Sequence, residues 1–212
     1  MDASAWTDDD TAVSVRAQMV DAAIELVRVE GAHALHAERL AEQVQHAPDE
    51  VFREFPSRHG LVAATITRWY EHQIGPAVSI ASSFGAVAFL HAVLVGNRKD
   101  PHLVRLLVST LASASDPAHP VSPYYRQQHS AFRRTVRDFL TADVARGREP
   151  ATMDPRAASQ QLVALYEGLL LQGVLHDDLD TVSAFDRAAS RLRRGWSEPY
   201  RCADHYASET DL

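Results

Sequence analysis

Apolar residues recur every three or four positions along most of this 212-residue chain, and no stretch alternates regularly between apolar and polar residues. A period near 3.6 residues is typical of amphipathic helices, whereas a half-buried strand has a period of two. Glycines and prolines interrupt the pattern at Gly31, Pro48, Gly75, Pro76 and Gly147, where they suit the ends of helices. The sequence therefore predicts an all-α fold of about nine helices.

The first third of the chain holds the two shortest predicted helices. Those of the first third are expected at residues 15–30, 40–44, 48–55 and 57–75. Those of the rest are expected at residues 84–95, 100–111, 122–146, 154–176 and 181–194. We therefore divide the chain into a disordered acidic arm at residues 1–12, a helix-turn-helix domain at 13–61, a larger helical domain at 62–195 and a polar tail at 196–212.

The negative charge of the chain lies in its N-terminal part. Residues 1–61 hold twelve acidic and five basic residues, which accounts for the whole net charge of −7. Residues 62–212 hold sixteen of each sign and are neutral as a unit. Any surface in the first third that binds an anionic partner must therefore do so against an unfavourable overall charge.

The location of the protein follows from what the chain lacks. It has one cysteine, Cys202, no apolar run of about twenty residues, and no N-terminal sequence typical of a signal peptide. These features predict a cytoplasmic protein with no internal disulfide and no contact with membranes.

The first third has the layout of a helix-turn-helix, in which a tight turn leads into a recognition helix that enters the major groove of DNA. Its residues resemble the N-terminal pattern of the TetR family in order and spacing: Arg16, Ala22, Ala23, Leu26, Gly31, Leu40, Ala41, Val44, Phe52, Phe55, Arg58 and Leu61. The rest is similar to the repressor branch of that family shared with choline-responsive regulators. This second resemblance is carried by Asp116-Pro117, His119-Pro120, Tyr124-Tyr125, Asp154-Pro155, Ala157-Ala158 and residues 164–172.

The resemblance implies that the helix-turn-helix binds operator DNA. Phe52 stands where the family usually has a tyrosine that faces phosphate, and Arg58 stands where it usually has a lysine at the start of the fourth helix. A helix N-terminus beside a cation is a suitable phosphate anchor. The implied DNA-binding residues are Arg16, His36, Gln45, Pro48, Asp49, Glu50, Phe52, Arg53 and Arg58.

The recognition segment departs from the family pattern. Gln45 replaces the usual turn glycine, His36 replaces the threonine or serine that opens the second helix, and Ala47 has no oxygen to cap the third. Asp49 and Glu50 occupy the first turn of the third helix. They favour that helix because its N-terminus is positive, and they can partly substitute for the missing cap. The same carboxylates also oppose phosphate, so we predict weak, salt-sensitive and acid-favoured DNA binding.

The resemblance also implies a homodimer in which the last two helices form a four-helix bundle with a second copy. Leu165, Gly168 and Leu169 give the helix at 154–176 an apolar face, and residues 169–175 carry no charge. The alternative is that this helix is ordinary core. The expected interface residues are Leu162, Leu165, Gly168, Leu169, Gln172, Phe185, Ala188 and Leu192.

An effector pocket in the larger domain is a further implication of the resemblance. A few polar groups in an apolar cavity suit a small, moderately hydrophobic ligand. The alternative is ordinary packing with satisfied hydroxyl groups. The expected lining residues are Trp69, Phe89, His91, Leu107, Thr110, Tyr125, His129, Phe132, Tyr166 and Gln172.

Other chemistry has little support in the sequence. His33 and His36 are three residues apart, but they belong to no zinc-like ligand set or metalloprotease motif. No nucleophile elbow or phosphate-binding loop is present. We therefore predict no metal, no cofactor and no catalytic residue.

Two functions are consistent with these features. The first is a dimeric, ligand-responsive transcription repressor that binds a near-palindromic operator and releases it when an effector binds. The alternative is a small-molecule-binding or protein-binding module that keeps the fold but has weakened or lost DNA binding, as the acidic recognition segment suggests.

Overall fold

The computed structural model describes residues 4–197, with side chains from residue 15 onward, and every regular element in that range is a helix. The prediction of an all-α fold with about nine helices is confirmed. The elements are α1 (Ser4–Glu30), the short 3-10 turn η1 (Ala32–Ala34), α2 (Ala37–Val44), α3 (Pro48–Glu54), α4 (Arg58–Phe84), α5 (Ala86–Asn97), α6 (Pro101–Ala114), α7 (Ser122–Ala145), α8 (Pro155–Leu175) and α9 (Thr181–Gly195).

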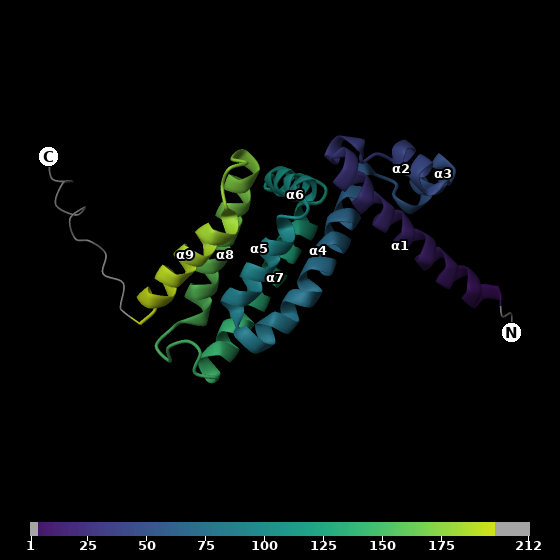
Figure 1. The fold of residues 1–212 in the computed structure, drawn as a ribbon. Coiled ribbons are helices and arrows are strands. Elements are labelled where there is room, and N and C mark those ends of the chain that lie inside the picture. Colours follow the sequence, from purple (N-terminus) through teal and green to yellow (C-terminus); the bar gives the residue numbers. More distant parts are fainter. Residues whose placement is uncertain (1–3, 198–212) are drawn as a thin grey trace.

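The helices form a small head and a larger body that share α4 (Figure 1). The head consists of α1, α2, α3 and the first turns of α4. The body consists of the rest of α4 and α5 to α9, with α9 on the side away from the head. The long helix α4 therefore belongs to both parts.

The helices of the head pack around a compact core. Residues typical of helix ends stand at the end of α1 and at the start of α4. α1 ends at Gly31, which has a φ of 90° and whose N–H donates to the carbonyl of Val27 at 2.9 Å. α4 is capped by Ser57, which precedes it and whose hydroxyl accepts the N–H of Gly60 at 3.1 Å. The buried residues of this core include Ala23, Val27, Leu35, Leu40, Val51, Phe55 and Leu61.

The prediction that α4 ends at Gly75 and Pro76 is wrong, because the helix continues through Pro76 to Phe84. A proline inside a helix removes one backbone hydrogen bond and crowds the preceding turn. The turns that follow are held by the body core, where Ala77 and Ala81 are 2% and 1% exposed. Burial against the neighbouring helices therefore outweighs the local cost.

The predicted disordered arm is also partly wrong, because α1 begins at Ser4 and residues 4–12 are helical. Residues 4–30 contain no glycine or proline, so no helix breaker separates the polar segment from the amphipathic one. Residues 1–3, and the predicted polar tail beyond residue 197, lie outside the described part of the chain.

The body core lies around α5, which contacts α4, α6, α7, α8 and α9. Its largest fully buried side chains include Trp69, Phe89, Phe185 and Leu140, with Tyr166 at 2% exposure. None of the described helices combines the length and apolar character needed to cross a membrane.

Candidate functional site

The turn between α2 and α3 has a left-handed residue that is not glycine. Gln45 has φ 57° and ψ 38°, and it is the one non-glycine with positive φ in the part of the chain that the structure describes. The N–H of His46 donates to the carbonyl of Ala41 at 3.1 Å, which completes the cap of α2. The tight turn between α2 and α3 is therefore formed although Gln45, and not glycine, occupies its left-handed position.

The N-terminus of α3 is capped from inside the helix. Ala47 provides no side-chain oxygen, but the Glu50 carboxylate accepts the Ala47 N–H at 3.3 Å. The same carboxylate lies 2.7 Å from Nδ1 of His46. The hydrogen bond from His46 is the largest cause of a lowered pKa for Glu50. Glu50 thus has a structural role at this helix end, in keeping with one of the two interpretations of its acidic side chain.

The N-terminus of α2 is capped by a histidine. When the imidazole is neutral with its hydrogen on Nε2, Nδ1 of His36 accepts the N–H of Arg39 at 3.3 Å. The same nitrogen lies 3.2 Å from the Glu38 carboxylate. Protonation of Nδ1 would therefore exchange the helix cap for an ion pair.

Most arginines of the head already have partners inside the head. Arg16 contacts the Glu54 carboxylate at 3.4 Å and stacks over the ring of Phe55 at 4.2 Å. Arg39 contacts Glu30 at 2.5 Å. Arg58, which the family resemblance implies as a phosphate contact, donates to the carbonyls of Leu35 and Ala32 at 3.2 and 3.3 Å.

The exposed side of α3 carries a mixed set of groups. Pro48, Asp49, Phe52 and Arg53 are exposed on it, with Gln45 at the preceding turn. Phe52 is 45% exposed, and the side chain of Arg53 is 74% exposed with only a distant Glu50 contact at 3.8 Å. The structure thus brings most of the implied DNA-binding residues to one face, on which Arg53 is the most accessible cation.

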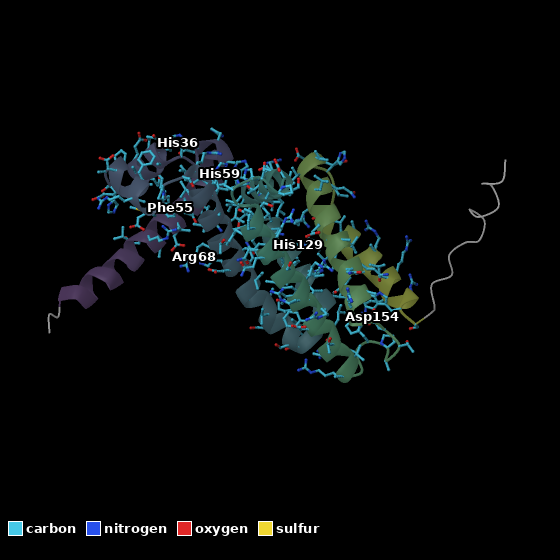
Figure 2. All side chains as sticks on the ribbon, turned by 180° about the vertical axis from the view of Figure 1, so that it is seen from behind. His36, Phe55, His59, Arg68, His129 and Asp154 are labelled. Carbon is cyan, nitrogen blue, oxygen red and sulfur yellow. The ribbon has the colours of Figure 1, made fainter. Side chains whose placement is uncertain are left out.

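A cavity of about 270 Å³ lies in the body between α4, α6, α7 and α8. It is lined by Ile66, Thr67, Tyr70, Glu71, Ile74, Leu107, Leu111, Tyr124, Tyr125, Gln128, His129, Ala131, Phe132, Thr135, Tyr166, Glu167 and Leu170. Figure 2 shows His129 within the body and His36 and His59 in the head.

Half of the expected pocket residues line this cavity: Leu107, Tyr125, His129, Phe132 and Tyr166. The other five lie elsewhere, because each is engaged in another contact or faces away. Trp69 and Phe89 are fully buried in the core, His91 pairs with Asp186 at 2.8 Å, Thr110 donates to the carbonyl of Leu106 at 2.7 Å, and Gln172 is exposed on α8.

Sequence reasoning missed the α4 wall of the cavity. Ile66, Tyr70 and Ile74 are spaced by four residues on one side of α4, and Glu71 follows Tyr70. Tyr124, Gln128, Phe132 and Thr135 form a similar row on α7. This spacing places each row on one helix face. It is the feature of the sequence that could have identified these residues as lining one cavity.

Four of the six hydroxyl groups that line the cavity form two pairs. Those of Tyr70 and Tyr166 are 3.0 Å apart, and Nδ2 of Asn97 donates to Tyr166 at 3.1 Å. Thr67 and Tyr124 form a second hydroxyl pair. Burial raises the pKa of Tyr70 and raises the pKa of Tyr166 to about 12, so both phenols are neutral at pH 7.

The expected dimer residues do not all reach the surface. Leu162, Leu169 and Phe185 are 0%, 6% and 0% exposed, so they pack inside the protomer and are not available to a second copy. Leu165, Gly168, Ala188 and Leu192 are partly exposed, and Gln172 is exposed. The outward face of α8 instead shows Ala164, Leu171 and Leu175, with Leu171 and Leu175 at 48% and 66% exposure.

Within the described residues, no three His, Cys, Asp or Glu side chains come together as a metal site.

Comparisons with known proteins agree with this architecture. Residues 85–195, more than half of the chain, match the family described as BetI-type transcriptional repressor, C-terminal. A search of curated proteins found no match. A TetR transcription regulator from Haloarcula marismortui has a similar structure, with 17% identity, a TM-score of 0.73, and coverage of 85% of this chain and 97% of that one.

A TetR-family transcriptional regulator from Streptomyces coelicolor is 25% identical, with a TM-score of 0.63 and coverage of 93% of this chain and 97% of that one. The secondary repressor of a multidrug efflux pump in Pseudomonas aeruginosa is 17% identical, with a TM-score of 0.53 and coverage of 89% and 96%. All three are described as transcription regulators or repressors. The chain belongs to the TetR family of transcriptional regulators, with a C-terminal domain of the BetI repressor type.

Proposed function

We propose that this protein is a ligand-responsive transcription repressor that binds a near-palindromic operator as a homodimer. The observation that carries the proposal is that the cavity and the head share one helix. Ile66, Tyr70 and Ile74 of α4 line the cavity, while Leu61 at the start of α4 is buried in the head core. A ligand that moves α4 must therefore move the head.

The mechanism is a coupling between two sites through one bistable dimer. In the ligand-free state the two heads present their α3 helices to successive major grooves. A ligand between α4 and α7 shifts the tilt of α4, changes the spacing of the two heads and lowers their affinity for the operator.

The proposed dimer uses the outward faces of α8 and α9. Ala164, Gly168, Leu171 and Leu175 follow one another at intervals of three or four residues along α8, so they form one stripe of small and apolar residues. Gly168 has no neighbour that an added Cβ would meet, so the backbone is open to close approach by a second helix.

We propose that DNA binding is weak, sensitive to salt and favoured by acid. Arg16 of α1 and Arg58 of α4 make their contacts within the head. Arg53 of α3 is therefore the main cation that remains accessible to DNA. His36, His46 and His59 of the head carry positive charge only when they are protonated, so acid would favour binding to phosphate.

A second candidate function is a TetR-fold module that binds a small molecule or a protein and no longer uses DNA in the usual way. Its support is the same set of internal ion pairs, because a phosphate contact by Arg16 would have to compete with Glu54. Asp49 and Glu50 add two carboxylates at the helix end that would face the DNA backbone.

Fluorescence anisotropy with the DNA upstream of the gene, at pH 6 and pH 8 over a range of salt concentrations, separates these functions. Asp49→Arg, which leaves Glu50 and its cap in place, should tighten binding and steepen the salt dependence by about one phosphate contact. Asp178→Arg, an exposed residue between α8 and α9, is the control with the same change of charge. Tight binding that is equal at both pH values contradicts the proposed weakness. Absence of any sequence-specific binding by wild type and Asp49→Arg favours the second candidate.

A further inference from the structure

The walls of the cavity combine five aromatic side chains with aliphatic ones. The ring centroids of Tyr70 and Phe132 are 5.9 Å apart, and those of Phe132 and Tyr166 are 5.5 Å apart. Tyr124 and Tyr125 add two more rings from α7. A volume of about 270 Å³ with such walls suits a ligand whose body is a ring or another compact apolar group.

The charged groups around the cavity are of one sign. Glu71 and Glu167 line it, and no lysine or arginine is among its lining residues in the described part of the chain. Glu167 is 2.9 Å from Nε2 of His129, whereas Glu71 makes no ion pair within residues 15–197. Arg68, whose charge interacts with Glu71, pairs with Asp21 and does not line the cavity. An anionic ligand would therefore meet two carboxylates on the cavity wall, and a cation would be attracted.

The two carboxylates and the histidine beside Glu167 can accept hydrogen bonds from a ligand. An ionised carboxylate has only acceptor sites, and Nδ1 of His129 is also an acceptor when Nε2 carries the hydrogen that faces Glu167. Three acceptor groups from Glu71, His129 and Glu167 are therefore suited to a cation that brings its own N–H donors. A quaternary ammonium has the charge but no N–H group to donate.

One hydroxyl hydrogen is left over at the Tyr70–Tyr166 pair. Asn97 donates Nδ2 to Tyr166, and the bond between the two phenols uses one of their two hydrogens. Both phenols keep their hydrogens at neutral pH because burial raises their pKa. Since both residues line the cavity, the second hydrogen is available to an acceptor on the ligand.

We propose that this cavity binds a protonated primary or secondary amine on an aromatic or similarly compact apolar body that also carries a hydrogen-bond acceptor. The proposal rests on the proposed function in that it names the chemical class of its effector. The ammonium group lies against Glu71 and Glu167, the apolar body lies among the aromatic rings, and the acceptor faces Tyr70 and Tyr166.

Calorimetric titration of the full chain with a matched series of probes tests this class. The probes are 3-phenoxypropylamine, its alcohol 3-phenoxypropan-1-ol, its acid 3-phenoxypropanoate and its trimethylammonium derivative. The amine should bind at least about tenfold tighter than the alcohol, and the acid should bind most weakly, because a charge-assisted hydrogen bond replaces a neutral one. The trimethylammonium probe should bind more weakly than the amine.

Variants of the lining carboxylates and phenols, with a control on α2, assign the preference to residues. Glu71→Gln and Glu167→Gln should each reduce the preference for the amine over the alcohol, whereas Glu38→Gln on α2 should leave it unchanged. The double variant Tyr70→Phe/Tyr166→Phe, which removes both hydroxyl hydrogens of the pair, should reduce the advantage of 3-phenoxypropylamine over 4-phenylbutylamine, which has a methylene group in place of the ether oxygen. Because each comparison is between probes on one variant, a general loss of stability does not imitate the result.

The outcomes for the ligand class and for the proposed function are distinguishable. Equal binding of amine, alcohol and acid, binding preference for the acid, or no binding of any probe overturns the amine class. Stronger binding of the trimethylammonium probe than of the amine overturns the requirement for N–H donors. If the amine binds as expected but leaves operator affinity unchanged in the anisotropy assay, the ligand class stands and the ligand-responsive function fails.

Discussion

Arg28 and Asp100 form an ion pair between the last turn of α1 and the start of α6, with Nε of Arg28 2.7 Å from the Asp100 carboxylate. The same carboxylate accepts Nε1–H of Trp69 at 2.8 Å and Nε2–H of Gln73 at 3.2 Å. Asp100 is 5% exposed. One carboxylate therefore joins the head helix α1 to α4 and α6, both of which line the cavity.

Replacing this carboxylate should destabilise the protein. Asp100→Asn leaves one acceptor oxygen for several donors and turns an amide toward Arg28, so we expect a loss of about 2 kcal/mol in the free energy of unfolding. Urea denaturation measures it. Asp177→Asn is the control. The Asp177 side chain is 88% exposed, so its ion pair with Arg105 should contribute less than about 0.5 kcal/mol. Equal losses in the two variants would contradict the expectation.

The same carboxylate should make stability depend on pH in the acid range. Burial alone would raise the pKa of Asp100, but the hydrogen bonds from Arg28 and Trp69 outweigh it, and the net shift is downward. The folded state therefore gains stability above the unfolded pKa, near 3.9. This gain is lost as the pH falls through the lower folded pKa. Thermal unfolding between pH 3 and pH 6 should show a shallower decline for Asp100→Asn than for wild type.

Relieving the left-handed backbone at Gln45 should stabilise the head. Gln45→Gly removes the Cβ contact that disfavours a φ of 57°, so we expect a gain of about 0.5–1 kcal/mol after the added flexibility of the unfolded chain is subtracted. Gln43→Gly, two residues earlier inside α2, should instead cost about 0.5–1 kcal/mol. A loss of stability in both variants would show that the Gln45 side chain itself is needed at the turn.

The cap at α3 should also respond to acid. The pKa of Glu50 is lowered mainly by the hydrogen bond from His46, so its contribution is present above its usual pKa near 4.5 and lost as the pH falls through the lower folded value. Glu50→Gln should lower the melting temperature at pH 7 and have little effect at pH 3. Asp49→Asn, which shares the helix end but has no histidine contact, should change the melting temperature less at pH 7. A larger effect of Asp49→Asn would argue against the His46–Glu50 contact.

A charge on the outward face of α8 should separate the proposed dimer. Leu175 is 66% exposed, so Leu175→Glu has little effect on the protomer core but places a charge in an apolar interface. Light scattering should give twice the mass of the 23.4 kDa chain for wild type and a single mass for the variant. Val29→Glu, on α1 and 78% exposed, is the control. A variant that remains dimeric would exclude this stripe as the interface.

The helix boundaries that sequence reasoning predicted well are those with a local chemical cause. Gly31 ends α1 because the backbone there is left-handed, and α4 begins after Ser57 because the hydroxyl of Ser57 caps the helix. Pro76 misled the prediction because the cause of the continued helix is not local. Ala77 and Ala81 hold it in the body core, and no property of residues 74–78 alone reveals that burial.

The inner and outer sides of apolar helices were harder to predict. α8 is apolar around much of its circumference, so the sequence does not tell the buried Leu162 and Leu169 from the exposed Leu171 and Leu175. The same ambiguity on α4 led to the selection of Trp69, which faces Asp100, in place of Tyr70, which lines the cavity. Only the packing of neighbouring helices decides which face is enclosed.

The uninterrupted length of α4 determines how finely the body can control the head. Its 27 residues give it a length of about 40 Å at 1.5 Å per residue. A rotation of roughly 5° about the body end would move the head end by about 3 Å, which is close to the rise of one base pair along DNA. A rigid lever of this length converts a small rotation at the body end into a register error at the groove, and a break at Pro76 would have shortened the lever and reduced that amplification.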